Sequence, residues 1–164
     1  MIPLVRVDNR LLHGQVLETW IPKLGVSGVV VVDDEAAGSP LAQAAMTLCC
    51  PAEVPVRVLR QDEADFAALA AEPGRLLVLV RDVAGLTAAV ARGLTPALAP
   101  RLNLGNLHHT PGRKPVSPSV FLDVTDLEAL HALAAQGFEV EARAIPSDPP
   151  AGPDELARRY ATAR

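Results

Sequence analysis

The chain has 164 residues, of which 49% are hydrophobic and 3% aromatic, and its formal net charge is -4. This apolar content excludes general disorder, and the length suits one domain over residues 1–164 with a sizeable core. The acidic balance and the shortage of aromatic side chains argue against nucleic acid as a partner.

Apolar runs and helix signals alternate through most of the chain. The strands are expected at residues 2–7, 28–32, 54–59 and 76–80, and the helices at about 13–24, 39–50, 61–71 and 82–92. Ser39 followed by Pro40 and, later, Asp82 are typical helix starts. Pro55 indicates an edge position for its strand, and Pro22 should distort the end of the first helix. The alternation predicts βα units in a parallel sheet with helices on both faces.

The pattern changes after Pro100. Short strands are expected at residues 101–104 and 119–122, separated by a long loop at 105–118 and followed by a helix that starts at Thr125 or Asp126 and ends at 136. Residues 139–145 alternate charged and apolar side chains, which predicts a half-exposed strand near an edge. A turn-rich linker at 146–153 should precede a terminal helix at 154–161.

The stretch from Arg6 to Gln15 lies where the first expected strand meets the first expected helix. In open α/β sheets this turn is at the carboxyl end of the strands, where ligands bind. The unpaired amides that open a helix favour an anion there. His13 is the best candidate for chemistry, because an imidazole nitrogen can attack phosphorus and form a phosphoramidate.

The neighbours of His13 are suited to such a site. Arg10 could donate paired hydrogen bonds to a phosphoryl group, and Gly14 would let the backbone approach it closely. Asp8 could fix the tautomer of His13, or it could hold Arg10 or Arg6 in place. The residue pattern leaves these roles open.

Each candidate also has a purely structural interpretation. His13 could be a capping or packing residue, and Arg6 a buried, paired charge. Asp33 could contact substrate or simply end a strand. His108 and its neighbour point apart without other ligands nearby, so they are expected to line a loop and to hold no metal. Ser147 is first a turn residue and second a site residue. No cofactor is expected, since the chain has neither a Walker motif nor a dinucleotide-binding glycine motif.

The segment Arg6-Val-Asp-x-Arg-Leu-Leu-His-Gly-Gln-Val16 closely resembles the signature of the IIB subunit of the mannose/fructose/sorbose family of the bacterial sugar phosphotransferase system. Further segments resemble other parts of that family: Val30–Glu35, Asn103–His108, Glu139–Arg143 and Pro146–Asp148. The resemblance therefore spans nearly the whole chain.

The resemblance implies a single-domain α/β fold with a mostly parallel open sheet and an antiparallel edge near the C-terminus. It implies that His13 is a phosphocarrier, phosphorylated on the ring nitrogen nearer the backbone. The donor would be a phosphohistidine on IIA, and the acceptor a sugar held by the membrane subunits IIC and IID. The implied location is the cytoplasm, at the inner face of the membrane. The family's arginine and aspartate at the Arg10 and Asp8 positions surround that site. Our further candidates are Arg6, Gly14 and Gln15 as supporting residues, and Asp33, His108 and Ser147 as residues lining the site.

Two other functions stay open at this stage. The same phosphohistidine could report to a regulatory protein and never meet a sugar. The chain could also bind a nucleotide at the same turn, although the absence of nucleotide-binding motifs makes this the weaker alternative. The sequence selects neither the sugar nor the oligomeric state, and a homodimer is one option.

Overall fold

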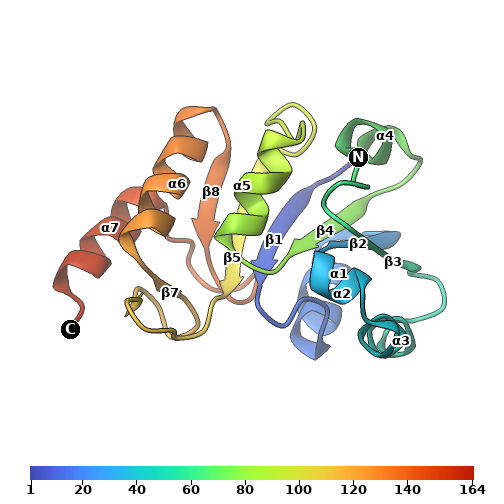
Figure 1. The fold of residues 1–164 in the computed structure, drawn as a ribbon, viewed down its shortest axis with the longest axis horizontal. Coiled ribbons are helices and arrows are strands. Elements are labelled where there is room, and N and C mark those ends of the chain that lie inside the picture. The colour runs from blue at the N-terminus through green and yellow to red at the C-terminus, as the bar shows by residue number, and fades with distance from the viewer.

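The computed structural model describes residues 1–164, which form an α/β unit around a six-stranded sheet (Figure 1). The strand order is β3-β2-β4-β1-β5-β8, and every neighbouring pair is parallel. The strands are β1 (Leu4–Asp8), β2 (Gly28–Val32), β3 (Val56–Leu59), β4 (Leu76–Val80), β5 (Arg101–Asn106) and β8 (Glu139–Ala142). The predicted parallel sheet is confirmed, and β3 and β8 lie at its edges, as Pro55 and the charge alternation predicted.

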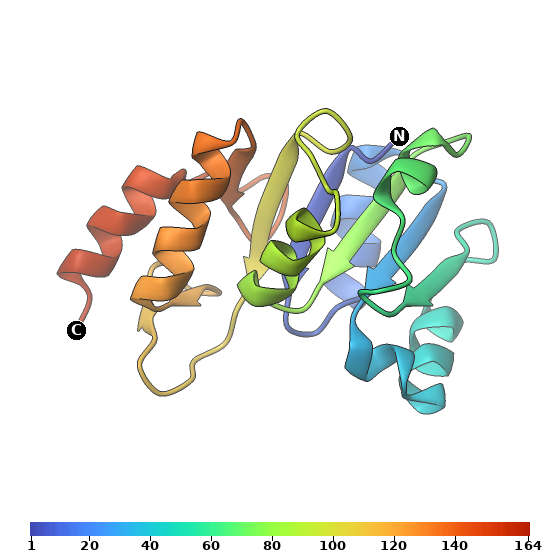
Figure 2. The same ribbon diagram turned by 45° about the horizontal axis from the view of Figure 1, so that its top comes forward.

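Helices cover both faces of this sheet, as predicted. They are η1 (Val16–Trp20), α1 (Ile21–Leu24), α2 (Asp34–Ala37), α3 (Pro40–Cys49), α4 (Phe66–Ala71), α5 (Val83–Ala91), α6 (Val124–Ala135) and α7 (Pro153–Thr162). In β1, Leu4 packs in the core with η1 to α3, whereas Val5 and Val7 pack in the core with α4 to α7. Figure 2 shows α5 and α6 along one side of the sheet and the first helical segment behind it.

The path of the chain places β1 in the middle of the sheet. From β1 the chain runs outward to β2 and β3, returns to β4 beside β1, and then continues on the other side of β1 to β5 and β8. The strand order therefore reverses around β1. In open α/β sheets the crevice at such a reversal, at the carboxyl ends of the strands, is where ligands bind. The turn after Asp8 lies at this end of the sheet.

The antiparallel pairing predicted near the C-terminus is present on a small scale. The edge strand β8 forms one antiparallel bridge, between Ala142 and Ala151, with N···O distances of 2.8 and 3.1 Å. A separate two-stranded ribbon pairs β6 (Lys114–Pro115) with β7 (Phe121–Leu122). The expectation of a loop over 105–118 was therefore wrong in part, because residues 105–106 belong to β5 and residues 114–115 to β6.

Other boundaries differ for local reasons. The first helix begins as the π-helical segment η1 and turns α-helical at Ile21, next to Pro22, which has no N–H to donate. The helix expected from residue 61 begins only at Phe66, where the Asp65 side chain caps it. The short helix α2 was not predicted; it is capped by Asp33. None of the helices has the length and apolar character needed to cross a membrane.

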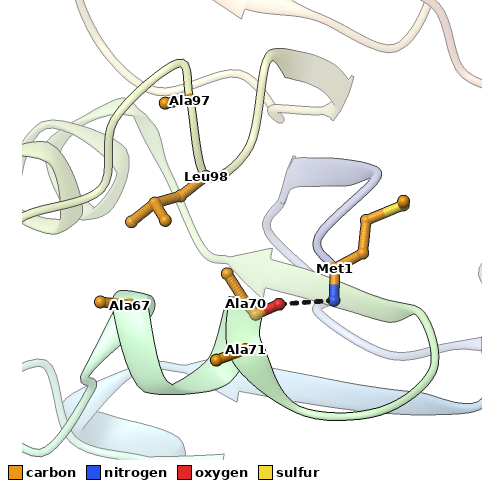
Figure 3. Close-up of a pocket in the computed structure, with 6 residues that line it drawn as sticks. All are labelled: Met1, Ala67, Ala70, Ala71, Ala97 and Leu98. Atoms are coloured by element: carbon orange, nitrogen blue, oxygen red, sulfur yellow. Dashed lines mark hydrogen bonds between the residues drawn. The ribbon is translucent and has the colours of Figure 1, made fainter.

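A cavity at the opposite end of the sheet from Asp8 is lined only by apolar residues. It lies beside Met1, whose amino group donates to the carbonyl of Ala70 at 2.8 Å (Figure 3). Its volume is about 350 Å³, and its lining is Met1, Ala67, Ala70, Ala71, Ala97 and Leu98. With no polar side chain in its wall, it offers no group for chemistry.

Candidate functional site

A tight turn joins β1 to the first helical segment. The Leu11 N–H donates to the carbonyl of Asp8 at 2.9 Å, and Leu11 adopts a left-handed conformation with φ of 56°. That conformation is costly for leucine and is held here because the side chains of Leu11 and Leu12 are buried in the core. The first helical hydrogen bond runs from the Leu17 N–H to the carbonyl of His13 at 3.1 Å. His13 therefore stands at the helix start, as predicted.

The ring of His13 is oriented by Asp8. Its Nε2 lies 2.9 Å from Oδ2 of Asp8, whose side chain is 0% exposed, whereas the His13 side chain is 14% exposed. An ionised carboxylate can only accept a hydrogen bond, so this partner assigns the ring proton to Nε2. The lone pair of the neutral ring is then on Nδ1. An imidazole held in this way presents Nδ1 as its nucleophilic nitrogen.

The same Asp8 oxygen is held by a buried arginine. Arg6 is 0% exposed and donates to Oδ2 of Asp8 from Nη2 at 3.0 Å and from Nε at 3.3 Å. Its Nη1 donates to Oδ1 of Asn103 at 2.7 Å. Burial lowers the pKa of the Arg6 guanidinium, and the neighbouring Asp8 opposes this shift. Arg6 is thus the buried, paired charge of the structural interpretation, and it has no surface to offer a ligand.

Asp8 both fixes the tautomer of His13 and holds the Arg6 side chain, but it does not hold the Arg10 side chain. It binds His13 and Arg6 at once, but it binds Arg10 only through the Arg10 backbone N–H, at 3.0 Å from Oδ1. The Arg10 side chain is exposed and lines a cavity of about 370 Å³ together with Arg81. Arg10 is therefore the arginine of the motif that is free to meet a ligand.

Gly14 and Gln15 follow His13 on the first helical turn. Apart from its two neighbours in the chain, a Cβ atom built on Gly14 would meet no atom within 4 Å, so open space adjoins the backbone that follows His13. The carbonyl of Gln15 accepts from the hydroxyl of Thr19 at 2.6 Å. Gly14 thus leaves room for an approaching group. The hydrogen bond of Gln15 lies within the helical segment.

Of the three residues expected to line the site, Asp33 and His108 are held by contacts outside the His13 ring, and Ser147 lies in an exposed turn. Asp33 accepts from Arg81 at 2.7 and 2.9 Å and from the Ala36 N–H at 2.8 Å, so it caps α2 instead of contacting His13. The His108 N–H donates to Oδ1 of Asn9 at 2.6 Å, which ties its loop to the His13 turn. Ser147 is exposed in a turn, as its structural interpretation held.

The contacts of Asp33 lower the pKa of its carboxyl group. Burial acts to raise the pKa of the Asp33 carboxyl, but the hydrogen bonds from Arg81 and from the Ala36 N–H outweigh burial, and the pKa lies below its usual value. The carboxylate is therefore fixed in its charged form beside Arg81. Since Arg81 also donates to the carbonyl of Asn9 at 3.4 Å, this pair supports the loop next to the site.

Sequence reasoning missed several residues that hold the site. Asn103 and Gly105 on β5 and Arg143 beyond β8 all adjoin Arg6. Trp20 packs in the core, and its Nε1 donates to the carbonyl of Ala144 at 2.9 Å. One signal was available: Asn103 is a polar residue between two leucines of β5, and buried polar side chains need partners.

These features define the class of protein: an α/β sheet with a tautomer-fixed histidine at the carboxyl end of its central strand. Residues 2–162 match the family model described as PTS system sorbose subfamily IIB component. The chain therefore belongs to this family, the IIB components of the sorbose type in the sugar phosphotransferase system, which confirms the resemblance found in its sequence.

Individual relatives agree with this assignment. The N-acetylgalactosamine-specific phosphotransferase enzyme IIB component 2 of Escherichia coli (strain K12) is 30% identical over 149 residues, which are 90% of this chain and 93% of the relative. The PTS system mannose-specific EIIAB component of the same strain is 30% identical over 153 residues, 91% of this chain but 46% of that longer protein.

A solved structure shares the fold. The crystal structure of manxB from Thermoanaerobacter tengcongensis is similar to this structure with a TM-score of 0.85 and 26% sequence identity. The similarity covers 98% of this chain and 96% of that one. The strand order and the helices on both faces thus belong to a fold that has been solved by experiment.

Proposed function

We propose that this chain is a phosphocarrier that accepts a phosphoryl group on Nδ1 of His13 from a phosphohistidine of IIA. It then transfers this group to a sugar held by IIC and IID, as a protein-N-phosphohistidine–sugar phosphotransferase acting as one IIB domain. The observation that carries the proposal is the 2.9 Å contact between Nε2 of His13 and buried Asp8, which leaves Nδ1 as the free nucleophile. Membership of the IIB family supports the same role.

The proposed transfer needs no metal. The lone pair of Nδ1 attacks phosphorus in line while the bond between phosphorus and the donor's histidine nitrogen breaks. Nε2 keeps its proton, and the phosphorylated ring gains a positive charge that faces the Asp8 carboxylate. Because Asp8 is itself held by Arg6, the ring does not need to reorient during transfer, and positioning supplies much of the rate.

The negative charge of the phosphoryl group has its partners on the open side of His13. The exposed Arg10 guanidinium can donate two parallel hydrogen bonds to phosphoryl oxygens. The amides that follow His13 have no earlier helical turn to bond, so they can donate to the same group. Gly14 leaves the space that an incoming phosphohistidine requires.

Membership of the family supports a IIA donor and the membrane subunits IIC and IID as partners, but it does not select the sugar. The mannose-specific relative is named an EIIAB component, and this chain aligns with 46% of it, which supports a IIA phosphohistidine as the donor. Relatives named for N-acetylgalactosamine and for mannose are each 30% identical to this chain, so identity does not select the sugar. We place the protein in the cytoplasm, at the membrane face that carries IIC and IID.

Phosphoryl transfer from a labelled donor tests the proposal. Incubation with IIA-phosphate should label the wild-type chain, and His13→Ala should abolish the label without unfolding the protein. Adding membranes with IIC, IID and sugar should then discharge the label into sugar phosphate. Label that persists in His13→Ala would refute the assignment, and label that no sugar discharges would favour the regulatory function instead.

A further inference from the structure

Two guanidinium groups lie over the ring of Trp20. The Cζ atom of Arg6 is 5.3 Å from the ring centroid, and the Cζ atom of Arg143 is 5.5 Å from it. Trp20 is 1% exposed, and its Nε1 donates to the carbonyl of Ala144. Cations in this position are attracted by the ring, most strongly where water is excluded. The indole therefore connects Arg6, under the His13 turn, with the segment after β8.

Arg143 is fixed at both its ends. Its Nε donates to Oε1 of Glu141 and its Nη1 to the carbonyl of Pro146, each at 3.0 Å. Its own carbonyl accepts from Nη1 of Arg6 at 3.4 Å and from Nδ2 of Asn103 at 3.3 Å. Arg143 therefore meets Arg6 twice, through its backbone carbonyl and through the shared indole ring.

Gly105 closes the remaining side of Arg6. It lies in β5 where the register with β1 shifts between Val7 and Asp8. A Cβ atom at this position would come within 1.9 to 2.2 Å of three guanidinium atoms of Arg6, which no side chain can do without displacing Arg6. β-Bulges of this kind often lie next to active sites. The Arg6 guanidinium is thus confined between β5, Trp20 and the carbonyl of Arg143.

The confined Arg6 guanidinium acts on His13 through a single atom, Oδ2 of Asp8. Oδ2 of Asp8 accepts from Arg6 and from Nε2 of His13. If Arg6 shifts, Oδ2 loses its fixed partner and can turn away from the ring. The ring could then place its proton on Nδ1, the nitrogen that must carry the lone pair.

We infer that Arg143 is a positioning residue for phosphoryl transfer, acting through Trp20 and Arg6 to hold Asp8 against Nε2 of His13. The expected effect on the rate rests on the proposed function. The expected effect on the tautomer of His13 is independent of that function. Arg143 lies 130 positions after His13 and forms no hydrogen bond with it. It fixes which ring nitrogen is the nucleophile.

A matched pair of variants tests the inference. Arg101 pairs with the same Glu141 oxygen as Arg143, at 3.4 Å, but it does not lie over Trp20. In Arg143→Met we expect two-bond 1H–15N spectra of the unphosphorylated protein to show a mixture of His13 tautomers, whereas wild type and Arg101→Met show the Nε2–H form. We also expect kcat for phosphorylation by IIA-phosphate to fall about 10- to 100-fold in Arg143→Met with KM unchanged.

Arg143→Lys guards against a variant that fails to fold. Lysine keeps the charge and can still pair with Glu141, but it lacks the flat group that covers the indole, so we expect a folded protein with the same tautomer mixture. A wild-type tautomer and rate in a folded Arg143 variant would overturn the inference. Equal losses in the Arg101 and Arg143 variants would also overturn it, since they would assign the effect to Glu141. If wild type accepts no phosphoryl group, the proposed function fails, while the tautomer still decides the inference.

Discussion

At the scale of single residues, the Asp8 carboxylate combines structural support with the proposed chemistry. It is 0% exposed and binds the Arg6 side chain, the Arg10 backbone and the His13 ring. Removing one member of a buried ion pair leaves the other charge unpaired and costs about 3–5 kcal/mol. We expect Asp8→Ala to lower the free energy of unfolding by that amount, as measured by urea denaturation. A loss below about 1 kcal/mol would mean that Arg6 finds other partners.

Arg10 should behave in the opposite way. Its side chain is exposed, and substitutions at such positions usually change stability by less than about 0.5 kcal/mol. Loss of one donor to a transferring group, however, typically slows the reaction on the order of 100-fold. We therefore expect Arg10→Gln to keep wild-type stability and to slow phosphorylation by IIA-phosphate about 100-fold. An unchanged rate would show that Arg10 does not touch the phosphoryl group.

Gly14 offers a variant that separates stability from function. The residue is helical, without a left-handed φ, and a Cβ there would meet nothing within 4 Å. Alanine should therefore raise the free energy of unfolding by up to about 1 kcal/mol. The added methyl group would occupy the space beside His13, so phosphorylation should slow although the protein is more stable. A rate equal to or above that of wild type would contradict the role given to this space.

The sequence motif predicted which residues surround His13 but not the individual roles of Arg6, Asp8 and Arg10. Local spacing placed Arg6, Asp8 and Arg10 together, and the strand-to-helix turn gave the position of His13. That Arg6 points into the core depends on Trp20, Asn103 and Gly105, which come from other elements. Such long-range contacts leave no periodic signal in the sequence, so the division of roles required the structure.

At the scale of elements, capping residues and apolar runs predicted most helices and strands. Ser39 and Asp82 cap α3 and α5 as expected, because their side-chain oxygens accept from backbone N–H groups of the first turn. The predictions failed for α2 and β6, which span four and two residues, and the π-helical form of η1 within the expected first helix was not predicted. Elements this short owe their existence to neighbouring contacts, such as the pair of Asp33 with Arg81.

The cap of α2 predicts a dependence of stability on pH. Because the folded state lowers the pKa of Asp33, its charge stabilises the fold above the unfolded value of about 3.9 and loses this effect as the pH falls through the lower folded value. Asn at this position can still cap the helix but cannot pair with Arg81. We expect Asp33→Asn to be about 1 kcal/mol less stable at pH 7, the Arg81 side chain being partly exposed, and close to wild type near pH 2. A difference that is constant across this range would contradict the ion pair.

At the scale of the whole molecule, the strand order explains why the site lies where it does. β1 lies between β4 and β5, so its carboxyl end is flanked by the loops that carry Arg81 and His108. Asn9 binds both loops, through the carbonyl of Arg81 at 3.1 Å and the N–H of His108 at 2.6 Å. Alternating βα units predicted the parallel sheet, but the pairing of β8 in parallel with β5 depended on a path across the sheet that local patterns do not encode.

The position of the phosphoryl group on the His13 ring distinguishes directly between Nδ1 and Nε2 as the nucleophile. The uniformly 15N-labelled chain should be phosphorylated with IIA-phosphate and examined by 31P and 1H–15N spectroscopy. The contact between Nε2 and Asp8 predicts a single phosphohistidine at residue 13, with phosphorus bonded to Nδ1 and a proton retained on Nε2. Phosphorus on Nε2, or on any residue other than His13, would contradict it.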